Sequence, residues 1–310
     1  GFDLAQLQPE LVANGPDKDI VVAHRLRNHI IVLGTPSDIE EFLKPLDAEA
    51  EREGRRRAAV VFVNDAHPSE QQISNIRGAD QCYFLASSPL NPTSIEMANV
   101  EACSRIVMFA DTSLENDPDE PGLIDAGVIF AYRFLKQNRY RDKACRCVME
   151  LVEDGNMSYL RDDGEGSHEH ASRIHTQPLF AQGQVYSSSI CTTLLVQAFY
   201  NEDILLIASS LLTGTPDYIT STGGSGAEPP TSPVLVHTEI SAQDMKSCAS
   251  YGDLFKLYLG RGLMPLALFR LCDEHEPRNE DRFVLTNPSK DLPLRPKDIA
   301  IVLEQPGYRR

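Results

Sequence analysis

Short apolar runs alternate with segments of helical periodicity through the first half of the chain. The first run, residues 28–34, reads Asn-His-Ile-Ile-Val-Leu-Gly, and apolar residues recur at helical spacing from Ile39 onward. The alternation predicts strands at residues 28–34, 58–63, 81–86, 105–110 and 145–152, and helices at 39–44, 69–76, 93–100 and 123–137. The last helix is apolar almost all round, which predicts that it is buried. This order of elements predicts an α/β fold with a Rossmann-like, doubly wound parallel sheet.

The second half of the chain has a different pattern. Residues 186–200 and 203–212 predict two amphipathic helices joined by a short polar turn, which form a helical hairpin. After a Gly-, Ser-, Thr- and Pro-rich connector, a smaller C-terminal α/β lobe is expected, with strands at 234–237, 266–271, 282–286 and 298–303 and a helix at 251–259. The predicted organisation is an N-terminal extension (1–27), a Rossmann-like lobe (28–160), an acidic loop and connection (161–185), the hairpin (186–212), the connector (213–233) and the C-terminal lobe (234–310).

Net charge limits the expected partners, and cysteine content indicates the expected cellular environment. The 310 residues include 45 Asp and Glu against 29 Lys and Arg, a formal net charge of -16, which is the opposite of the basic surface that nucleic acids and anionic membranes require. No apolar run approaches the roughly 20 residues that span a bilayer, and the first residues do not resemble a signal peptide. The 7 cysteines include no CxxC pair, so they are expected to be reduced, structural thiols of a cytosolic protein.

Catalytic and nucleotide-binding motifs are weak or absent. Gly34 is the only glycine of the turn after the first strand, and Pro36 has no amide hydrogen to donate to a pyrophosphate, so no nucleotide is expected to bind there. The sequence has no GxSxG, HExxH or GxxxxGK[ST] motif. The serines at 187–189 and 209–210 are expected on helices, where serine hydroxyls more often pack or hydrogen-bond to the preceding helical turn. The chain is not expected to be an enzyme.

An ordered set of motifs resembles one channel family. The motifs are Met149-Glu-Leu-Val-Glu-Asp, Thr176-Gln-Pro-Leu-Phe-Ala, Phe199-Tyr-Asn-Glu-Asp-Ile-Leu, Tyr251-Gly-Asp-Leu-Phe and Val284-Leu-Thr-Asn-Pro, with further matches at 28–34, 86–90 and 111–114. Together they resemble the second RCK domain (regulator of potassium conductance) of the large-conductance calcium-activated potassium channels, the Slo family. The resemblance covers nearly the whole chain.

The resemblance implies a cytosolic gating-ring domain that couples ligand binding to opening of a potassium channel. Its partners would be the first RCK domain and pore of the same channel and the neighbouring subunits of a homotetramer, and the isolated domain could dimerise. The hairpin would pack against the partner RCK domain, although a clamp on the chain's own first lobe is the alternative. The expected assembly residues are Leu194, Leu195, Phe199, Ile204 and Leu205. The competing class is a Rossmann-type nucleotide-dependent enzyme or a nucleotide-sensing potassium-uptake subunit.

The resemblance also implies where calcium would bind. In the family a dense run of aspartates before the Thr-Gln-Pro motif supplies oxygen ligands, and the corresponding segment here is residues 161–170. This segment departs from the family pattern, because Arg161 adds a positive charge and the contiguous aspartates are missing. A solvated acidic loop, or a transition-metal site built on its histidines, is the alternative. The candidate calcium ligands are Asp162, Asp163, Glu165 and Glu169.

Overall fold

A computed structural model describes two compact units, each with its own sheet and hydrophobic core. The first unit holds residues 1–180 and 184–190, and the second holds 181–183 and 191–310. The described residues are 23, 25–34, 36, 38–65, 81–111, 123–138, 140–144, 146–160, 177–213, 234–272 and 282–304. Among them, no helix has both the length and the apolar character needed to cross a membrane.

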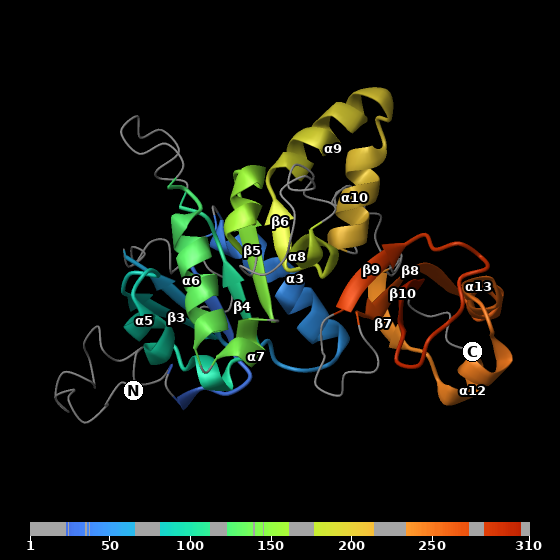
Figure 1. Cartoon of the computed structure of the whole chain (residues 1–310), viewed down its shortest axis with the longest axis horizontal. Coiled ribbons are helices and arrows are strands. Elements are labelled where there is room, and N and C mark those ends of the chain that lie inside the picture. Colours follow the sequence, from blue (N-terminus) through green and yellow to red (C-terminus); the bar gives the residue numbers. More distant parts are fainter. Residues whose placement is uncertain are drawn as a thin grey trace, which may run out of the picture. The chain divides into compact units, whose positions relative to one another are not determined.

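The sheet of the first unit is parallel throughout and has the order β3-β2-β1-β4-β5-β6 (Figure 1). Its strands are β1 (Ile30–Leu33), β2 (Val60–Asn64), β3 (Cys82–Ala86), β4 (Arg105–Met108), β5 (Cys147–Leu151) and β6 (Val185–Ser187). The Ile-Ile-Val-Leu run of β1 is buried at every position, as expected for a parallel strand covered on both faces. The order reverses between β1 and β4, which is the topological switch point of a doubly wound sheet. The predicted α/β, Rossmann-like fold is confirmed.

Helices cover the two faces of this sheet. On one face, Leu43 of α3 (Ile39–Arg52) packs with Val32 and Phe62. On the other, Leu135 of α6 (Ala126–Gln137) belongs to the cluster that contains Ile106. The remaining short helices of the unit are α5 (Pro92–Met97), η3 (Val100–Ala102), α7 (Arg141–Ala144), η5 (Asp154–Leu160) and α8 (Pro178–Ala181).

Three sequence expectations for this unit need correction. The helix expected at 93–100 is shorter, because Asn99 adopts a left-handed backbone with φ 55° after α5 and the chain continues as the short η3. The helix expected at 123–137, found as α6, is not buried on all sides, since the Phe130 side chain is 63% exposed. Residues 186 and 187 belong to strand β6, where pairing with β5 outweighs the local helical pattern that follows. The helix expected at 69–76 lies outside the described residues.

The second unit contains the helical hairpin from Cys191 onward and an antiparallel sheet of order β7-β10-β8-β9. The hairpin consists of α9 (Ser189–Tyr200) and α10 (Ile204–Thr213). The later elements are β7 (Val234–Glu239), α12 (Ala242–Ser247), α13 (Tyr251–Leu259), β8 (Leu263–Leu271), β9 (Arg282–Thr286) and β10 (Ile299–Glu304). Leu254 of α13 packs with Leu268 and Val302, so this helix covers one face of the sheet. A capping box between Ser250 and Asp253 begins α13.

Candidate functional site: the hairpin and its polar base

The expected assembly residues lie on a hairpin with an unusually apolar surface. No residue of α9 is buried among the described residues, and the Phe199 and Leu195 side chains are 79% and 68% exposed. Leu205 is 46% exposed, whereas Leu194 and Ile204 are half-buried. Val196, Tyr200, Leu206 and Ile207 are also exposed, and the Phe199 and Tyr200 rings meet edge to face with their centres 5.2 Å apart. Exposed apolar side chains in this number are typical of interaction surfaces.

Three consecutive serines, all within the first unit, lie at the start of α9. The Ser187 hydroxyl, in β6, donates to the Asp154 carboxylate and accepts a hydrogen bond from the Ser189 backbone N–H at 3.2 Å. The Ser188 N–H donates to Leu151 O at 3.1 Å. The expectation that all three serines lie on a helix is therefore wrong, because only Ser189 is helical. Polar residues directly before an apolar helix are typical N-terminal capping residues, and this signal could have placed the helix start correctly.

A buried carboxylate holds the turn that carries Asp154. Asp125 is fully buried and accepts hydrogen bonds from Val152 N (2.9 Å), Glu153 N (3.0 Å) and Asn156 Nδ2 (2.8 Å). These bonds join the beginning of α6 to the turn between β5 and η5. The sequence analysis did not single out Asp125, and a lone aspartate before a helix carries no signal that would have done so. Together with the serines, Asp125 forms the polar base of the hairpin.

The candidate calcium ligands Asp162, Asp163, Glu165 and Glu169 lie outside the described residues, as do the histidines of that segment. The chain enters the segment from the end of η5 at Leu160 and is described again from Gln177. Within the described part of the chain, no group of three or more His, Cys, Asp or Glu side chains is arranged to hold a metal ion.

Glu150 adds a titratable group at the carboxyl ends of β4 and β5. Burial raises the pKa of the Glu150 carboxyl, and the neighbouring Asp125 raises it further, although the Ala110 N–H donates to Glu150 Oε2 at 3.3 Å and opposes the shift. Glu150 therefore takes up a proton more readily than an ordinary glutamate.

Gly34, directly after β1, lies close to Phe109, and the start of α3 carries negative charge. Gly34 has φ 83°, and a Cβ atom at this position would lie 2.9 Å from Phe109 O, so only glycine fits without displacement. The following helix, α3, is capped by the Asp38 carboxylate, which accepts from Glu41 N at 3.1 Å, and Glu40 and Glu41 lie in its first turn. Carboxylates at this helix end repel the phosphates that a dinucleotide site would place there.

Comparisons with known proteins agree with this arrangement. A model described as the calcium-activated potassium channel slowpoke-like RCK domain matches residues 25–154, and one described as the Ca2+-activated K+ channel Slowpoke, TrkA_C like domain, matches residues 234–304. Potassium channel subfamily U member 1 of Macaca fascicularis is 25% identical and aligns with 93% of this chain. The calcium-activated potassium channel slowpoke of Drosophila melanogaster is 24% identical over 79% of it. The alignments span only 29% and 24% of those two proteins.

The solved structure of the human SLO3 gating ring has the same fold. It superposes with a TM-score of 0.67 at 23% identity, and the match covers 91% of this chain and 48% of that one. A Rossmann-like lobe, a helical hairpin and a small antiparallel lobe in this order define a regulatory RCK domain. The two family models together match more than half of the chain, and the chain belongs to the RCK domains of the slowpoke, or Slo, family of calcium-activated potassium channels.

Proposed function

We propose that this chain is a cytosolic gating-ring domain, the second RCK domain of a calcium-activated potassium channel, and that its hairpin transmits a ligand signal toward the pore. The observation that carries the proposal is the exposed apolar hairpin, which begins at a hydrogen-bonded polar base on the sheet lobe. The channel's first RCK domain and pore, and the neighbouring subunits of a homotetramer, would be its partners. The family relationship supports a regulatory rather than an enzymatic role.

The apolar surface of the hairpin can drive assembly. Burying a leucine or phenylalanine side chain contributes roughly 1.5–3 kcal/mol, so covering Leu195, Phe199 and Leu205 supplies several kcal/mol. Phe199→Asp together with Leu205→Asp should weaken self-association at least 100-fold, since about 1.4 kcal/mol corresponds to a factor of ten. Leu259→Asp changes an exposed leucine of α13, 54% exposed, and is the matched control. Light scattering at several concentrations measures the association.

A monomer at high concentration before any substitution would contradict self-association. Wild type and the same two variants are therefore also tested by co-purification with the first RCK domain. If neither a second copy nor the first RCK domain binds through the hairpin, the intersubunit role is wrong, and a clamp on the chain's own first lobe takes its place.

The polar base gives a physical route from the acidic segment to the hairpin. The segment 161–170 follows η5, and η5 begins at Asp154, whose carboxylate accepts a hydrogen bond from Ser187, two residues before α9. A ligand that draws on this segment would therefore bias the position of η5 and, through one hydrogen bond, the start of α9. Such coupling requires that the contact between η5 and the start of α9 has two arrangements and that the ligand binds one of them more tightly.

We further propose that calcium, if this domain senses it, binds the segment containing Asp162, Asp163, Glu165 and Glu169. Carboxylate oxygens are suitable calcium ligands, and the adjacent glycines allow tight turns. The positive charge of Arg161 opposes calcium binding, so the site would be weak or would need further ligands from a neighbouring subunit. Neutralising the four carboxylates together in the full channel should shift calcium activation to higher concentration in patch recordings. Neutralising Glu40 and Glu41 is the control. An unchanged activation curve would mean that the segment is only solvated and that the stimulus enters elsewhere.

We also infer that the nucleotide-dependent class is the weaker candidate, because Pro36 has no amide hydrogen to donate and carboxylates lie at the start of α3. Titration calorimetry with NAD and with ATP should give no heat of binding. A crystal soak that placed a nucleotide against Gly34 would overturn this inference and favour a nucleotide-sensing subunit.

A further inference from the structure

The strand β9 forms an open edge of the antiparallel sheet in the second unit (Figure 1). In this sheet β9 is the last strand and pairs with β8 on one side only. At the opposite edge α10 packs against β7, whereas β8 is the main neighbour of β9 among the described elements. Edge strands expose main-chain N–H and C=O groups that can pair with a strand of another chain. The strand β9 is therefore a candidate docking edge.

The register of β9 shows which of its main-chain groups point outward. Asn287 N donates to Leu266 O at 2.9 Å, which makes these two residues a hydrogen-bonded pair of the antiparallel ladder. Hydrogen-bonded and non-hydrogen-bonded pairs alternate, so every second residue of β9 directs its N–H and C=O groups away from β8. The residues with outward groups are Arg282, Val284 and Thr286. Within the described part of the chain, these outward groups form no hydrogen bond.

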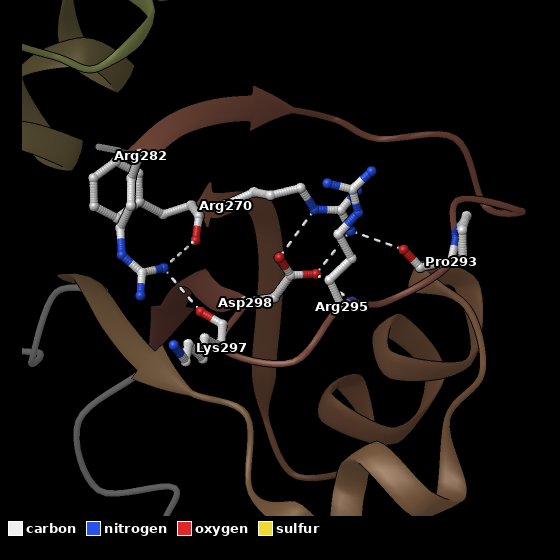
Figure 2. Close-up of polar contacts among 7 residues, drawn as sticks. Arg270, Arg282, Pro293, Arg295, Lys297 and Asp298 are labelled. Atoms are coloured by element: carbon white, nitrogen blue, oxygen red, sulfur yellow. Dashed lines mark hydrogen bonds and ion pairs between the residues drawn. The ribbon is translucent and has the colours of Figure 1, made fainter. Parts of the chain in front are cut away.

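The strand β9 lacks the features that usually block an exposed edge. Its sequence Arg-Phe-Val-Leu-Thr has no proline or lysine, and its one charged residue stands at the first position. This residue, Arg282, is directed toward the inside of the sheet, since its Nη1 donates to Phe269 O at 3.0 Å and to Lys297 O at 2.8 Å (Figure 2). Its guanidinium lies 5.7 Å from the centre of the Phe269 ring. The middle of the edge is therefore apolar and uncharged.

A buried ion pair fixes the strand on which β9 rests. Arg270 of β8 donates from Nε and Nη2 to the two oxygens of Asp298, at 2.9 and 2.7 Å, and from Nη2 to Pro293 O at 2.8 Å (Figure 2). The Arg270 and Asp298 side chains are 5% and 1% exposed. These contacts join β8 to the residue before β10. The edge is thus held in one conformation before it binds, which lowers the entropy cost of pairing.

We propose that β9 pairs antiparallel with β9 of a second copy of this chain, about a two-fold axis at Val284. In this register Val284 lies opposite the second copy's Val284, and Phe283 lies opposite the second copy's Leu285. Arg282 lies opposite the second copy's Thr286. The outward N–H and C=O groups of the two strands then bond to one another. Apolar residues meet apolar residues, and no like charges lie directly opposite each other.

A second copy fits this edge because the strand is complementary to itself. Phe283 and Leu285 are half-buried on one face of the sheet, and Leu285 packs with the core beneath α13. Their pairing would continue that core across the two copies. Both copies use the same edge, so assembly stops at a dimer. Two strands of 5 residues bury far less than the roughly 1,200–2,000 Å² of a stable interface, so the dimer should be weak and reversible.

The first test measures association of the complete 310-residue chain carrying Phe199→Asp and Leu205→Asp, so that the hairpin does not contribute. In this background, sedimentation equilibrium should show a weak dimer. Val284→Lys places two ammonium groups opposite each other at the two-fold axis and should weaken the dimer about tenfold. Leu235→Lys adds the same charge at a 39% exposed residue of β7, the other edge strand, and should leave the affinity unchanged.

Cysteine crosslinking in the same background tests the register. The two Cα atoms of an antiparallel hydrogen-bonded pair lie about 5.5 Å apart, so Val284→Cys should form a disulfide between copies with oxidised glutathione as oxidant. Thr286→Cys is the control on the same edge, because its two copies would lie about 14 Å apart, beyond the reach of a disulfide. The background chain without an added cysteine gives the level of crosslinking from the native cysteines.

The proposal is supported by a dimer that Val284→Lys weakens and Leu235→Lys does not, with crosslinking at position 284 and none above background at 286. If Val284→Lys alters the circular dichroism spectrum, Val284→Pro replaces it, since proline removes the outward N–H and is tolerated on an edge strand. A monomer at concentrations up to about 1 mM overturns the proposal, as do equal effects of the two lysines or equal crosslinking at the two positions.

The edge could instead bind a different chain. Crosslinking of Val284→Cys to a co-purified first RCK domain, and not to a second copy, would overturn the proposal by identifying another occupant. The proposal does not depend on the gating function. Because the hairpin is disabled throughout, failure of this contact and failure of the hairpin's proposed role are separate results.

Discussion

Replacing Asp125 by alanine should release the turn that supports the base of the hairpin. The substitution removes the acceptor for Val152 N, Glu153 N and Asn156 Nδ2 and leaves three partly buried donors without a partner. Each donor left without a partner costs about 1–3 kcal/mol, and partial access of water favours the lower end of this range. The free energy of local unfolding at this turn should therefore fall by about 3 kcal/mol. Asp125→Asn retains one acceptor oxygen and should lose about half as much.

Hydrogen–deuterium exchange measures this loss where it occurs, which matters because a chain of two units need not unfold in a single step. A loss of about 3 kcal/mol predicts roughly 100-fold faster exchange at Val152 and Glu153 in Asp125→Ala. Peptides from α13 provide an internal control, and Glu49→Gln, an exposed carboxylate of α3, provides a variant control. Unchanged exchange at the two amides would refute the assignment of Asp125 as the residue that holds this turn.

Two further predictions concern pH and backbone geometry. Burial lowers the pKa of His29, whose Nε2 bonds Ala98 O at 2.8 Å, so the folded state binds fewer protons than the unfolded state and stability should fall as pH drops below about 6.5. Urea midpoints at pH 7.5 and 5.5 should show a smaller drop in His29→Gln than in wild type or the exposed-residue control His237→Gln; equal drops would contradict the assignment. Gly34→Ala should lower the free energy of unfolding by about 2 kcal/mol or more, whereas Gly54→Ala, with φ 65° but nothing within 4 Å, should cost about 1 kcal/mol. Similar losses at the two glycines would show that contact with Phe109 is unimportant.

Several elements follow from the sequence because their signals are local. The helix expected at 251–259 is found as α13 with the same bounds, since a capping box at Ser250 precedes an amphipathic run. The strand expected at 282–286 is found as β9. The alternation of apolar runs and helices predicts the parallel sheet of the first unit, because strands buried on both faces need continuous apolar sequence.

Other elements depend on neighbours that are distant in sequence. Strand β6 has only three residues and exists because β5 offers an open edge, so its sequence reads locally as the beginning of a helix. The helix α12 was not predicted, since its six residues contain too little apolar periodicity. The sequence predicted an apolar hairpin, but only the structure separates the exposed Leu195, Phe199 and Leu205 from the half-buried Leu194 and Ile204.

The polar contacts that organise both units were decided by tertiary structure alone. Asp125 meets Val152 across 27 positions of the chain, and Arg270 meets Asp298 across 28. A hydrogen bond between side chains this far apart leaves no periodic trace in the sequence, because periodicity records burial and says nothing about which buried polar groups are partners. The apolar pattern therefore determined the fold class and the ordered motifs carried the family resemblance, whereas folding determined which charges are neutralised by a partner.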